Sequence, residues 1–125
     1  MGYLSPTEEQ IAEFASHPHE GTIWMWNLLR FTDEEGRASY QRYGEAVRPL
    51  VEKRGGRIVL RAEGKMTLIG PDGWDEAIVV EYPSRATFID MVTSDEYEAI
   101  AHFRQDAIAD SRLYMTSELP VPRAG

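Results

Sequence analysis

The chain has 125 residues, of which 42% are hydrophobic, enough for one core and too few for two domains of ordinary size. Its 21 acidic and 13 basic residues give a formal net charge of −8, which opposes attraction to phosphates and predicts no nucleic-acid partner. The absence of cysteine excludes disulfides, zinc sites built on thiolates and cysteine nucleophiles. No stretch approaches the roughly 18 apolar residues of a membrane span and none resembles a targeting signal, so we expect a cytoplasmic protein with no membrane partner.

A short helix is predicted over residues 5–16. Ser5 is a candidate N-cap, Pro6 suits the first helical position, and Glu8 stands three residues after the cap, as in a capping box. Pro18 disfavours helical angles at the residue before it and is expected to end the helix there. We expect this helix to pack against the domain as an addition to its core.

The stretch TIWMWNLLRF, residues 22–31, is apolar on both alternating sets of positions. This pattern is typical of a central strand that is covered on both faces. The next segment, residues 37–54, places apolar residues at helical spacing and ends at Gly55-Gly56. Pro49 lies inside this predicted helix and is expected to kink it.

Residues 57–69 alternate as a strand with one wetter face, and Gly70-Pro71-Asp72-Gly73 has the composition of a hairpin turn. The return strand is predicted over residues 76–82, because Pro83 ends strand pairing and Ser84 can cap a helix that runs to Val92. Three further elements complete the chain: a helix capped by Ser94 over residues 95–109, a last strand over 112–117 and an irregular tail over 118–125.

The predicted order is an N-terminal helix followed by β-α-β-β-α-β, so we expect a single α+β domain over residues 1–125, with a ferredoxin-like core over 22–117. In this fold the helices cover only one face of a four-stranded antiparallel sheet. The first strand is apolar on both faces, so the uncovered face needs another partner. A second copy of the chain is the economical choice, and a homodimer packed sheet against sheet is therefore predicted.

Three phrases together resemble the family known as domain of unknown function 1330: WNLLRF, YQRYGEAVRPLVEKRGGRIVL and WDEAIVVEYPSRATFIDMVTSDEYEAIAHFR. The resemblance covers nearly the whole chain after Ser5. It implies a dimeric α/β barrel of the ferredoxin-like group, and it implies no established substrate, cofactor or catalytic residue.

The wider group suggests catalytic candidates. Its cofactor-independent antibiotic-biosynthesis monooxygenases and haem-degrading monooxygenases place an asparagine on the first strand and a histidine on a helix. Asn27 stands at the matching strand position, whereas the histidine of the haem-degrading branch falls at Ala101, one residue before His102, and its tryptophan falls at Met91. One residue is about 100° of helical rotation, so this departure argues against haem ligation.

Asn27 and His102 are the catalytic candidates. Asn27 interrupts an apolar set and its amide needs a partner, either neighbouring backbone or a ligand. His102 has Glu98 and Asp106 four residues to either side, which favours a general base, although a solvated surface histidine fits the same pattern.

Arg30, Tyr43 and Arg104 are the substrate-binding candidates. The two arginines could hold a carboxylate or form salt bridges with the many acids, and the Tyr43 phenol could orient a substrate or serve only core packing. His17 and His19 have no third ligand nearby, and no phosphate-binding or nucleophile-elbow motif is present, so no metal or cofactor is predicted.

Two functional hypotheses follow. The first is a small cofactor-independent enzyme that acts on a small apolar or aromatic acid, in a pocket between helices and sheet. The alternative is a non-catalytic dimeric module that binds a small molecule or a protein.

Overall fold

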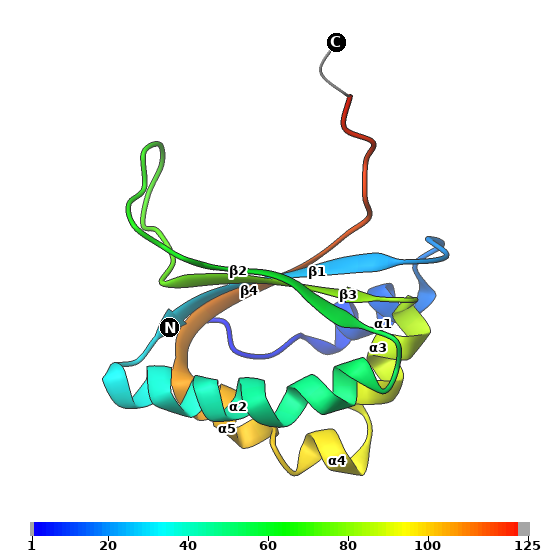
Figure 1. Cartoon of the computed structure of the whole chain (residues 1–125), viewed down its shortest axis with the longest axis horizontal. Helices are drawn as coiled ribbons and strands as arrows, with labels where there is room; N and C mark the ends of the chain where they lie inside the picture. Colours follow the sequence, from blue (N-terminus) through cyan, green and yellow to red (C-terminus); the bar gives the residue numbers. More distant parts are fainter. Residues whose placement is uncertain (1, 123–125) are drawn as a thin grey trace.

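The computed structural model describes residues 2–122 and contains a four-stranded sheet with helices packed on one face (Figure 1). The strands lie in the order β2-β3-β1-β4, and every neighbouring pair is antiparallel. The sheet consists of β1 (Ile23–Phe31), β2 (Arg57–Glu63), β3 (Glu76–Tyr82) and β4 (Ile108–Thr116). The helices are α1 (Glu8–Ser16), α2 (Glu34–Glu52), α3 (Arg85–Val92), α4 (Asp95–Glu98) and α5 (Ala101–Ala107). The predicted ferredoxin-like order is confirmed.

The core lies between the sheet and the helices. Alternation along β1 directs Ile23, Met25, Leu29 and Phe31 toward the helices, and all four are buried. These residues join two apolar clusters, one at each end of α2. The first is built from Leu29, Phe31, Tyr40, Tyr43, Ile78, Ala107 and Ile108. The second is built from Ile23, Met25, Leu50, Val51, Tyr82 and Met91.

Local signals explain where most elements begin and end. The Asp33 side chain caps α2 through the Gly36 backbone N–H, 2.8 Å away, and Gly55 ends that helix at a positive φ of 82°. Gly36 is required by packing, because a Cβ there would lie 2.6 Å from the Ala107 carbonyl oxygen. Ser84 caps α3 at the predicted position.

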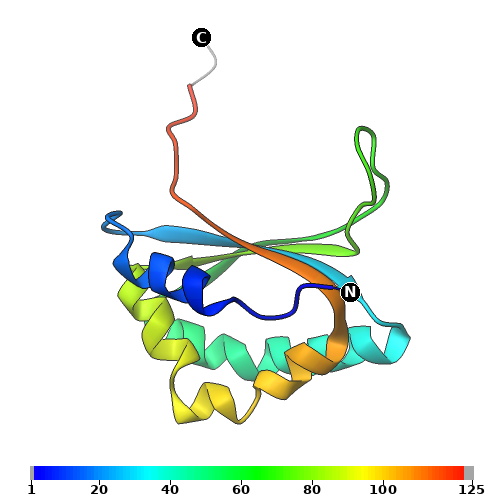
Figure 2. The ribbon, with the colours of Figure 1, turned by 180° about the vertical axis from the view of Figure 1, so that it is seen from behind.

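The N-terminal helix is shorter than predicted. Its cap is Thr7 rather than Ser5, and the capping box pairs the Thr7 hydroxyl with Gln10. None of the α1 residues is buried, and the helix lies beside α3 (Figure 2). Residues 2–7 form an extended segment that runs along the start of β4.

The predicted helix over residues 95–109 was wrong as a single element, because it divides into α4 and α5. Around Ile100 the backbone bonds span three residues, Ile100 N to Tyr97 O and Phe103 N to Ile100 O, at 3.0 and 3.1 Å. The Ile100 side chain packs against the second apolar cluster. Strand β4 consequently starts at Ile108, before the predicted boundary.

Strand β2 ends at Glu63, well before the predicted residue 69. The Gly64 backbone N–H donates to the Asp75 carbonyl at 2.8 Å, and beyond this bond residues 64–75 form a long hairpin loop. This loop and the C-terminal segment, residues 117–122, project from the sheet on the side opposite the helices (Figures 1 and 2). The sheet face between them is named here the open face.

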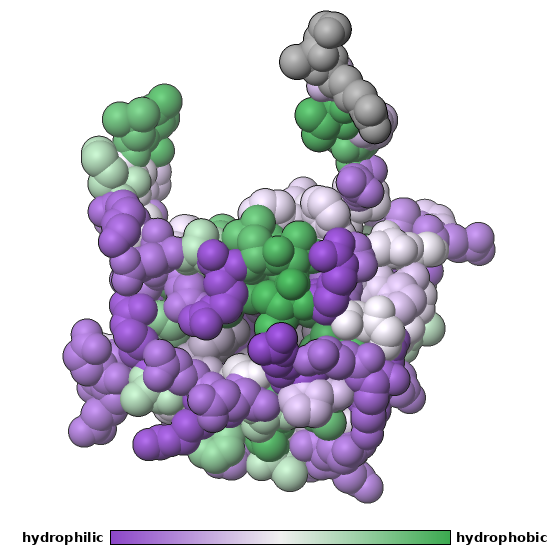
Figure 3. Space-filling view, in the orientation of Figure 1, coloured by the Kyte–Doolittle hydropathy of each residue, from purple (hydrophilic) through white to green (hydrophobic). Residues whose placement is uncertain are grey.

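Apolar side chains gather on the open face. Trp24, Trp26 and Leu28 of β1 alternate with the buried set and remain half-buried, and Leu60 of β2 is 41% exposed. In the space-filling view, apolar groups lie over the sheet between the two projections and again at the loop tip (Figure 3). Apolar residues on the projections are Met66, Leu68, Ile69, Leu119 and Val121. No helix within residues 2–122 is long and apolar enough to cross a membrane.

Candidate functional site

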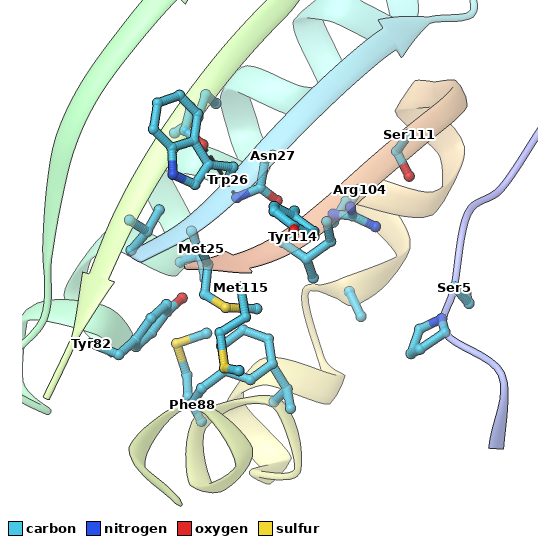
Figure 4. Close-up of a pocket in the computed structure, with 18 of the residues that line it drawn as sticks. Ser5, Met25, Trp26, Asn27, Tyr82, Phe88, Arg104, Ser111, Tyr114 and Met115 are labelled. Atoms are coloured by element: carbon cyan, nitrogen blue, oxygen red, sulfur yellow. Dashed lines mark hydrogen bonds between the residues drawn. The ribbon is translucent and has the colours of Figure 1, made fainter. Parts of the chain in front are cut away.

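A cavity of about 2000 Å³ lies between the helix layer and the sheet. Its walls come from β1, β3 and β4, from α1, α2, α3 and α5, and from the N-terminal segment. It exceeds the roughly 300 to 1,000 Å³ that is common for small-molecule sites. The cavity has a polar end and an apolar end (Figure 4).

Asn27 enters the cavity from the middle of β1. Its Nδ2 lies 3.5 Å from the Ile78 carbonyl oxygen, a long distance for a hydrogen bond, and the residue is only half-buried. This is its one side-chain hydrogen bond to the described residues. The amide therefore retains hydrogen-bonding capacity toward the cavity.

Three tyrosines, Tyr40, Tyr43 and Tyr97, bring phenols to the same space. The Tyr43 and Tyr97 hydroxyl oxygens are 2.8 Å apart. Burial raises the pKa of Tyr40 to about 12 and raises the pKa of Tyr43 well above its ordinary value. Both phenols consequently stay protonated at neutral pH, where they can donate hydrogen bonds but cannot act as bases.

Arg104, from α5, differs from the other arginines that line the cavity in its lack of an ion pair within residues 2–122. Arg48, Arg61 and Arg112 each pair with a carboxylate, at 2.8, 3.0 and 2.9 Å. Arg104 forms no ion pair with any residue in 2–122, and its Nη1 donates to the Leu4 carbonyl oxygen at 3.1 Å. Its half-buried guanidinium thus offers uncompensated positive charge at the polar end.

The N-terminal segment closes one side of this end. Ser111 Oγ donates to the Tyr3 carbonyl oxygen at 2.6 Å, and the Tyr3 backbone N–H donates to Asp110 Oδ1 at 2.8 Å. The bond from Tyr3 is the largest of several effects that hold the pKa of Asp110 below its ordinary value. Because Tyr3 and Leu4 are consecutive, Ser111 and Arg104 contact one short stretch of backbone and lie at the same end of the cavity.

The opposite end is apolar. Met25 and Met115 are register partners on β1 and β4, and Met91 reaches them from α3. The Tyr82 and Phe88 rings pack edge to face, with centroids 5.1 Å apart. Figure 4 shows Met25, Met115 and Phe88 together at this end, away from Arg104 and Ser111.

The structure brings together three of the five residues proposed from the sequence. Asn27, Tyr43 and Arg104 line the cavity, but His102 and Arg30 do not. His102 is exposed and its ring lies 4.1 Å from that of Phe103, because the half-buried side of α5 carries Phe103 and Arg104 instead. Asn27 and His102 therefore do not share this cavity, and a catalytic role for either residue stays a prediction.

Arg30 also lies elsewhere, because its position on β1 directs it to the open face. Its Nη2 donates to the Gly73 carbonyl oxygen at 2.7 Å, its Nη1 pairs with Asp110 at 3.4 Å, and its guanidinium lies 4.8 Å from the centre of the Trp74 ring. These contacts tie the base of the hairpin loop to the sheet. The substrate-binding role of Arg30 stays a prediction, and in the structure its side chain positions the loop.

Sequence reasoning missed Tyr97 and the methionines Met25 and Met115. Tyr97 was hidden inside a predicted continuous helix, although its place three residues after the capping Ser94 marks the first turn of α4. The methionines were indistinguishable from core residues, because alternation identifies a face of the sheet but cannot reveal space left above it. No group of three or more His, Cys, Asp or Glu side chains that could hold a metal occurs in the described part of the chain.

Comparison with known proteins places the chain in a family. The model for "Domain of unknown function (DUF1330)" matches residues 23–117. The chain belongs to this family. A family protein of unknown function from Rhodopseudomonas palustris has a crystal structure with 34% sequence identity and a TM-score of 0.89, and the match covers 97% of this chain and 100% of that one.

More distant structures share the fold of this DUF1330 protein. A dimeric ferredoxin-like protein of unknown function from Thermobifida fusca is 16% identical with a TM-score of 0.54, over 80% of this chain and 99% of that one. A Caulobacter crescentus protein, provisionally named an antibiotic biosynthesis monooxygenase, is 10% identical with a TM-score of 0.59, over 81% and 92%. No functionally curated protein matches the sequence.

Proposed function

We propose that the cavity of this DUF1330 protein binds a small apolar or aromatic carboxylic acid, with Arg104 as the partner of the carboxylate. The observation that carries the proposal is the Arg104 guanidinium, which lies at the polar end without a carboxylate partner in residues 2–122, in a chain with a net charge of −8. The other arginines that line the cavity, Arg48, Arg61 and Arg112, each form an ion pair with a carboxylate. A guanidinium with free donors is well suited to a ligand carboxylate.

Asn27 and the phenols supply the remaining polar contacts. The Asn27 amide has one long hydrogen bond, and the Tyr40 phenol is buried and neutral at the same cavity. In a cofactor-independent enzyme such donors would stabilise negative charge that develops on a substrate oxygen. The provisional name of the Caulobacter crescentus protein is compatible with this role, although a likeness at 10% identity concerns the fold alone.

The alternative is a binding module without catalysis, and one observation favours it. The imidazole of His102 lies outside the cavity, and the neutral phenols of Tyr40 and Tyr43 cannot accept a proton at neutral pH. Binding therefore requires only groups that the cavity has, whereas proton abstraction requires a base beyond those predicted from the sequence.

The binding proposal is tested by calorimetric and NMR titration with benzoate and hexanoate. We expect saturable binding that falls at least tenfold in Arg104→Gln, since a charge-assisted pair is lost. Arg42→Gln is the matched control, because Arg42 is exposed on α2 and does not line the cavity. Equal binding by both variants would contradict the proposal. Turnover lost in Asn27→Ala but retained in His102→Ala would support the enzyme, and absence of turnover with intact binding would support the module.

We also propose that the chain forms a homodimer through the open face. Trp24, Trp26 and Leu60 form an apolar surface there. Each of the two projections that flank it carries a strongly exposed apolar side chain, Leu68 on the hairpin loop and Leu119 on the C-terminal segment, at 86% and 79%. A second copy would cover this surface, and burial of roughly 800 Å² per protomer would suffice for a stable interface. The dimeric Thermobifida fusca protein has the same fold.

Sedimentation velocity tests the dimer. We expect a dimer for the natural chain and dissociation for Leu60→Asp, because a carboxylate would lie in the apolar contact. Ile11→Asp is the control, since Ile11 is similarly exposed but lies on α1. A monomeric natural chain, or a Leu60→Asp variant that sediments like the natural protein, would count against the open face as the interface.

A further inference from the structure

We infer that the acid bound in this cavity is an elongated, unbranched one of about eight to twelve carbons, whose carboxylate lies at Arg104 and whose chain ends among the methionines; this inference rests on the function proposed above. The features that carry it are the separation of the two ends of the cavity, the apolar path between them and the adaptable side chains at the far end.

The length follows from the register of β1 and β4. On the helix-facing side of these strands the paired residues are Leu29 with Ser111, Asn27 with Leu113, and Met25 with Met115. Strand residues advance by about 3.3 Å each, so Ser111 and Met115 are about 13 Å apart along β4. Ser111 marks the polar end, because it and Arg104 contact the consecutive carbonyls of Tyr3 and Leu4.

The path between the ends is apolar and uncovered. Leu113 has the same side-chain direction as Ser111 and Met115 and lines the cavity, yet it is 44% exposed. A compact acid held at Arg104 would leave Leu113 in contact with water, whereas Met25 and Met91 are already buried, at 3% and 2% exposure. An alkyl chain that extends along β4 would cover Leu113 and the half-buried Met115, which favours the longer ligand through the apolar area it buries.

The far end suits a flexible chain rather than a rigid ring system. Met25, Met91 and Met115 surround it from β1, α3 and β4, and methionine side chains adapt to irregular shapes because three torsions rotate. The Tyr82 ring also faces this end, and burial raises the pKa of its phenol, so no charge develops there at neutral pH. A terminal methyl group would meet apolar atoms on most sides.

The experiment titrates the full chain with straight-chain carboxylates from butanoate to tetradecanoate, kept below their critical micelle concentrations, with benzoate and decanol for comparison. We expect affinity to rise about fourfold per methylene up to about ten carbons and then to level off. Met115→Phe, which shortens the apolar end, should move this plateau to shorter acids and leave butanoate binding unchanged. Met66→Phe is the control, since Met66 is 76% exposed on the hairpin loop.

The outcomes separate this inference from the proposed function. If benzoate and butanoate bind through Arg104 but affinity does not rise with chain length, the elongated ligand is wrong and the acid-binding proposal stands. A rise without a plateau, unaffected by Met115→Phe, indicates adsorption to exposed apolar surface and also overturns the inference. If no acid binds, or decanol binds as well as decanoate in both the natural chain and Arg104→Gln, the proposed function itself fails.

Discussion

The two faces of the sheet treat their polar groups differently. On the open face, Trp24 Nε1 donates to Glu81 at 2.9 Å, Trp26 Nε1 donates to Thr116 at 3.0 Å, and Arg30 bonds to Gly73 and Asp110. On the helix-facing side, Asn27 has a single hydrogen bond of 3.5 Å and Arg104 has no carboxylate partner among the described residues. Neighbouring residues of β1 therefore differ: Trp24, Trp26 and Arg30 are paired on the open face, whereas Asn27 keeps free capacity on the cavity side.

This difference indicates which polar groups of the protein are candidates for binding a ligand. A polar group whose bonds are satisfied within the chain stabilises the structure, whereas one left with free capacity in a cavity can bind a ligand. Apolar content does not distinguish the two faces, because both are rich in large side chains. The helix-facing side differs in that it also holds Asn27 and Arg104, two polar groups with free hydrogen-bonding capacity.

The largest expected effect compares adjacent leucines of β1. Leu29 is fully buried against α2, and Leu29→Ala should lower the free energy of unfolding by about 2 to 5 kcal/mol, since it leaves a cavity in the core. Leu28→Ala, on the half-buried open face, should cost less than half as much in dilute protein. Urea unfolding measures both, and equal losses would show that the open face is as well packed as the core.

The next effect concerns alkaline pH on the helix-facing side. The pKa of Tyr40 is raised from 10.0 to about 12, so between these values the folded state keeps a proton that the unfolded state loses. The contribution of Tyr40 to the free energy of unfolding is fully present below pH 10. It falls by about 2 to 3 kcal/mol as the pH rises toward 12. Tyr40→Phe should flatten the pH dependence of urea unfolding across that range, and an unchanged slope would contradict this account.

A smaller effect is expected for the phenol pair. Tyr43→Phe removes the bond to Tyr97 and should reduce the free energy of unfolding by about 1 kcal/mol, because half-buried Tyr97 can recover part of the loss from water. Tyr114→Phe is the control on β4, where the side chain is 68% exposed and should change stability little. A larger decrease in the free energy of unfolding for Tyr114→Phe than for Tyr43→Phe would contradict the assigned role of the phenol pair.

The smallest effect concerns the N-terminal segment at the cavity. The pKa of Asp110 is lowered, first by the hydrogen bond from the Tyr3 backbone N–H, so its contribution is present above the ordinary value of 3.8 and is lost as pH falls below it. Amide exchange at Tyr3 should therefore become faster, relative to other amides, below about pH 4. Asp110→Asn should abolish that added acid sensitivity, and its persistence in the variant would exclude Asp110 as the cause.

The fold was largely predictable because the residues that begin and end its helices and strands act locally. Pro83 and Ser84 mark the junction of β3 and α3, and Gly55 marks the end of α2, so each boundary is written within a few residues. The hairpin loop and the break at Ile100 were not predictable in this way. Both involve contacts with distant residues, the Gly64 to Asp75 backbone bond and the second apolar cluster.

The candidate site was predictable only in part. Asn27, Tyr43 and Arg104 were identifiable as polar groups in apolar surroundings, but the same argument selected Arg30 and His102, which lie outside the cavity. Sequence by itself determined the order of the elements and which residues share a face, since alternation and helical spacing are properties of the local backbone. Only the tertiary structure decided which of those polar groups lack partners and where space remains beside them, because both depend on packing between elements far apart in the chain.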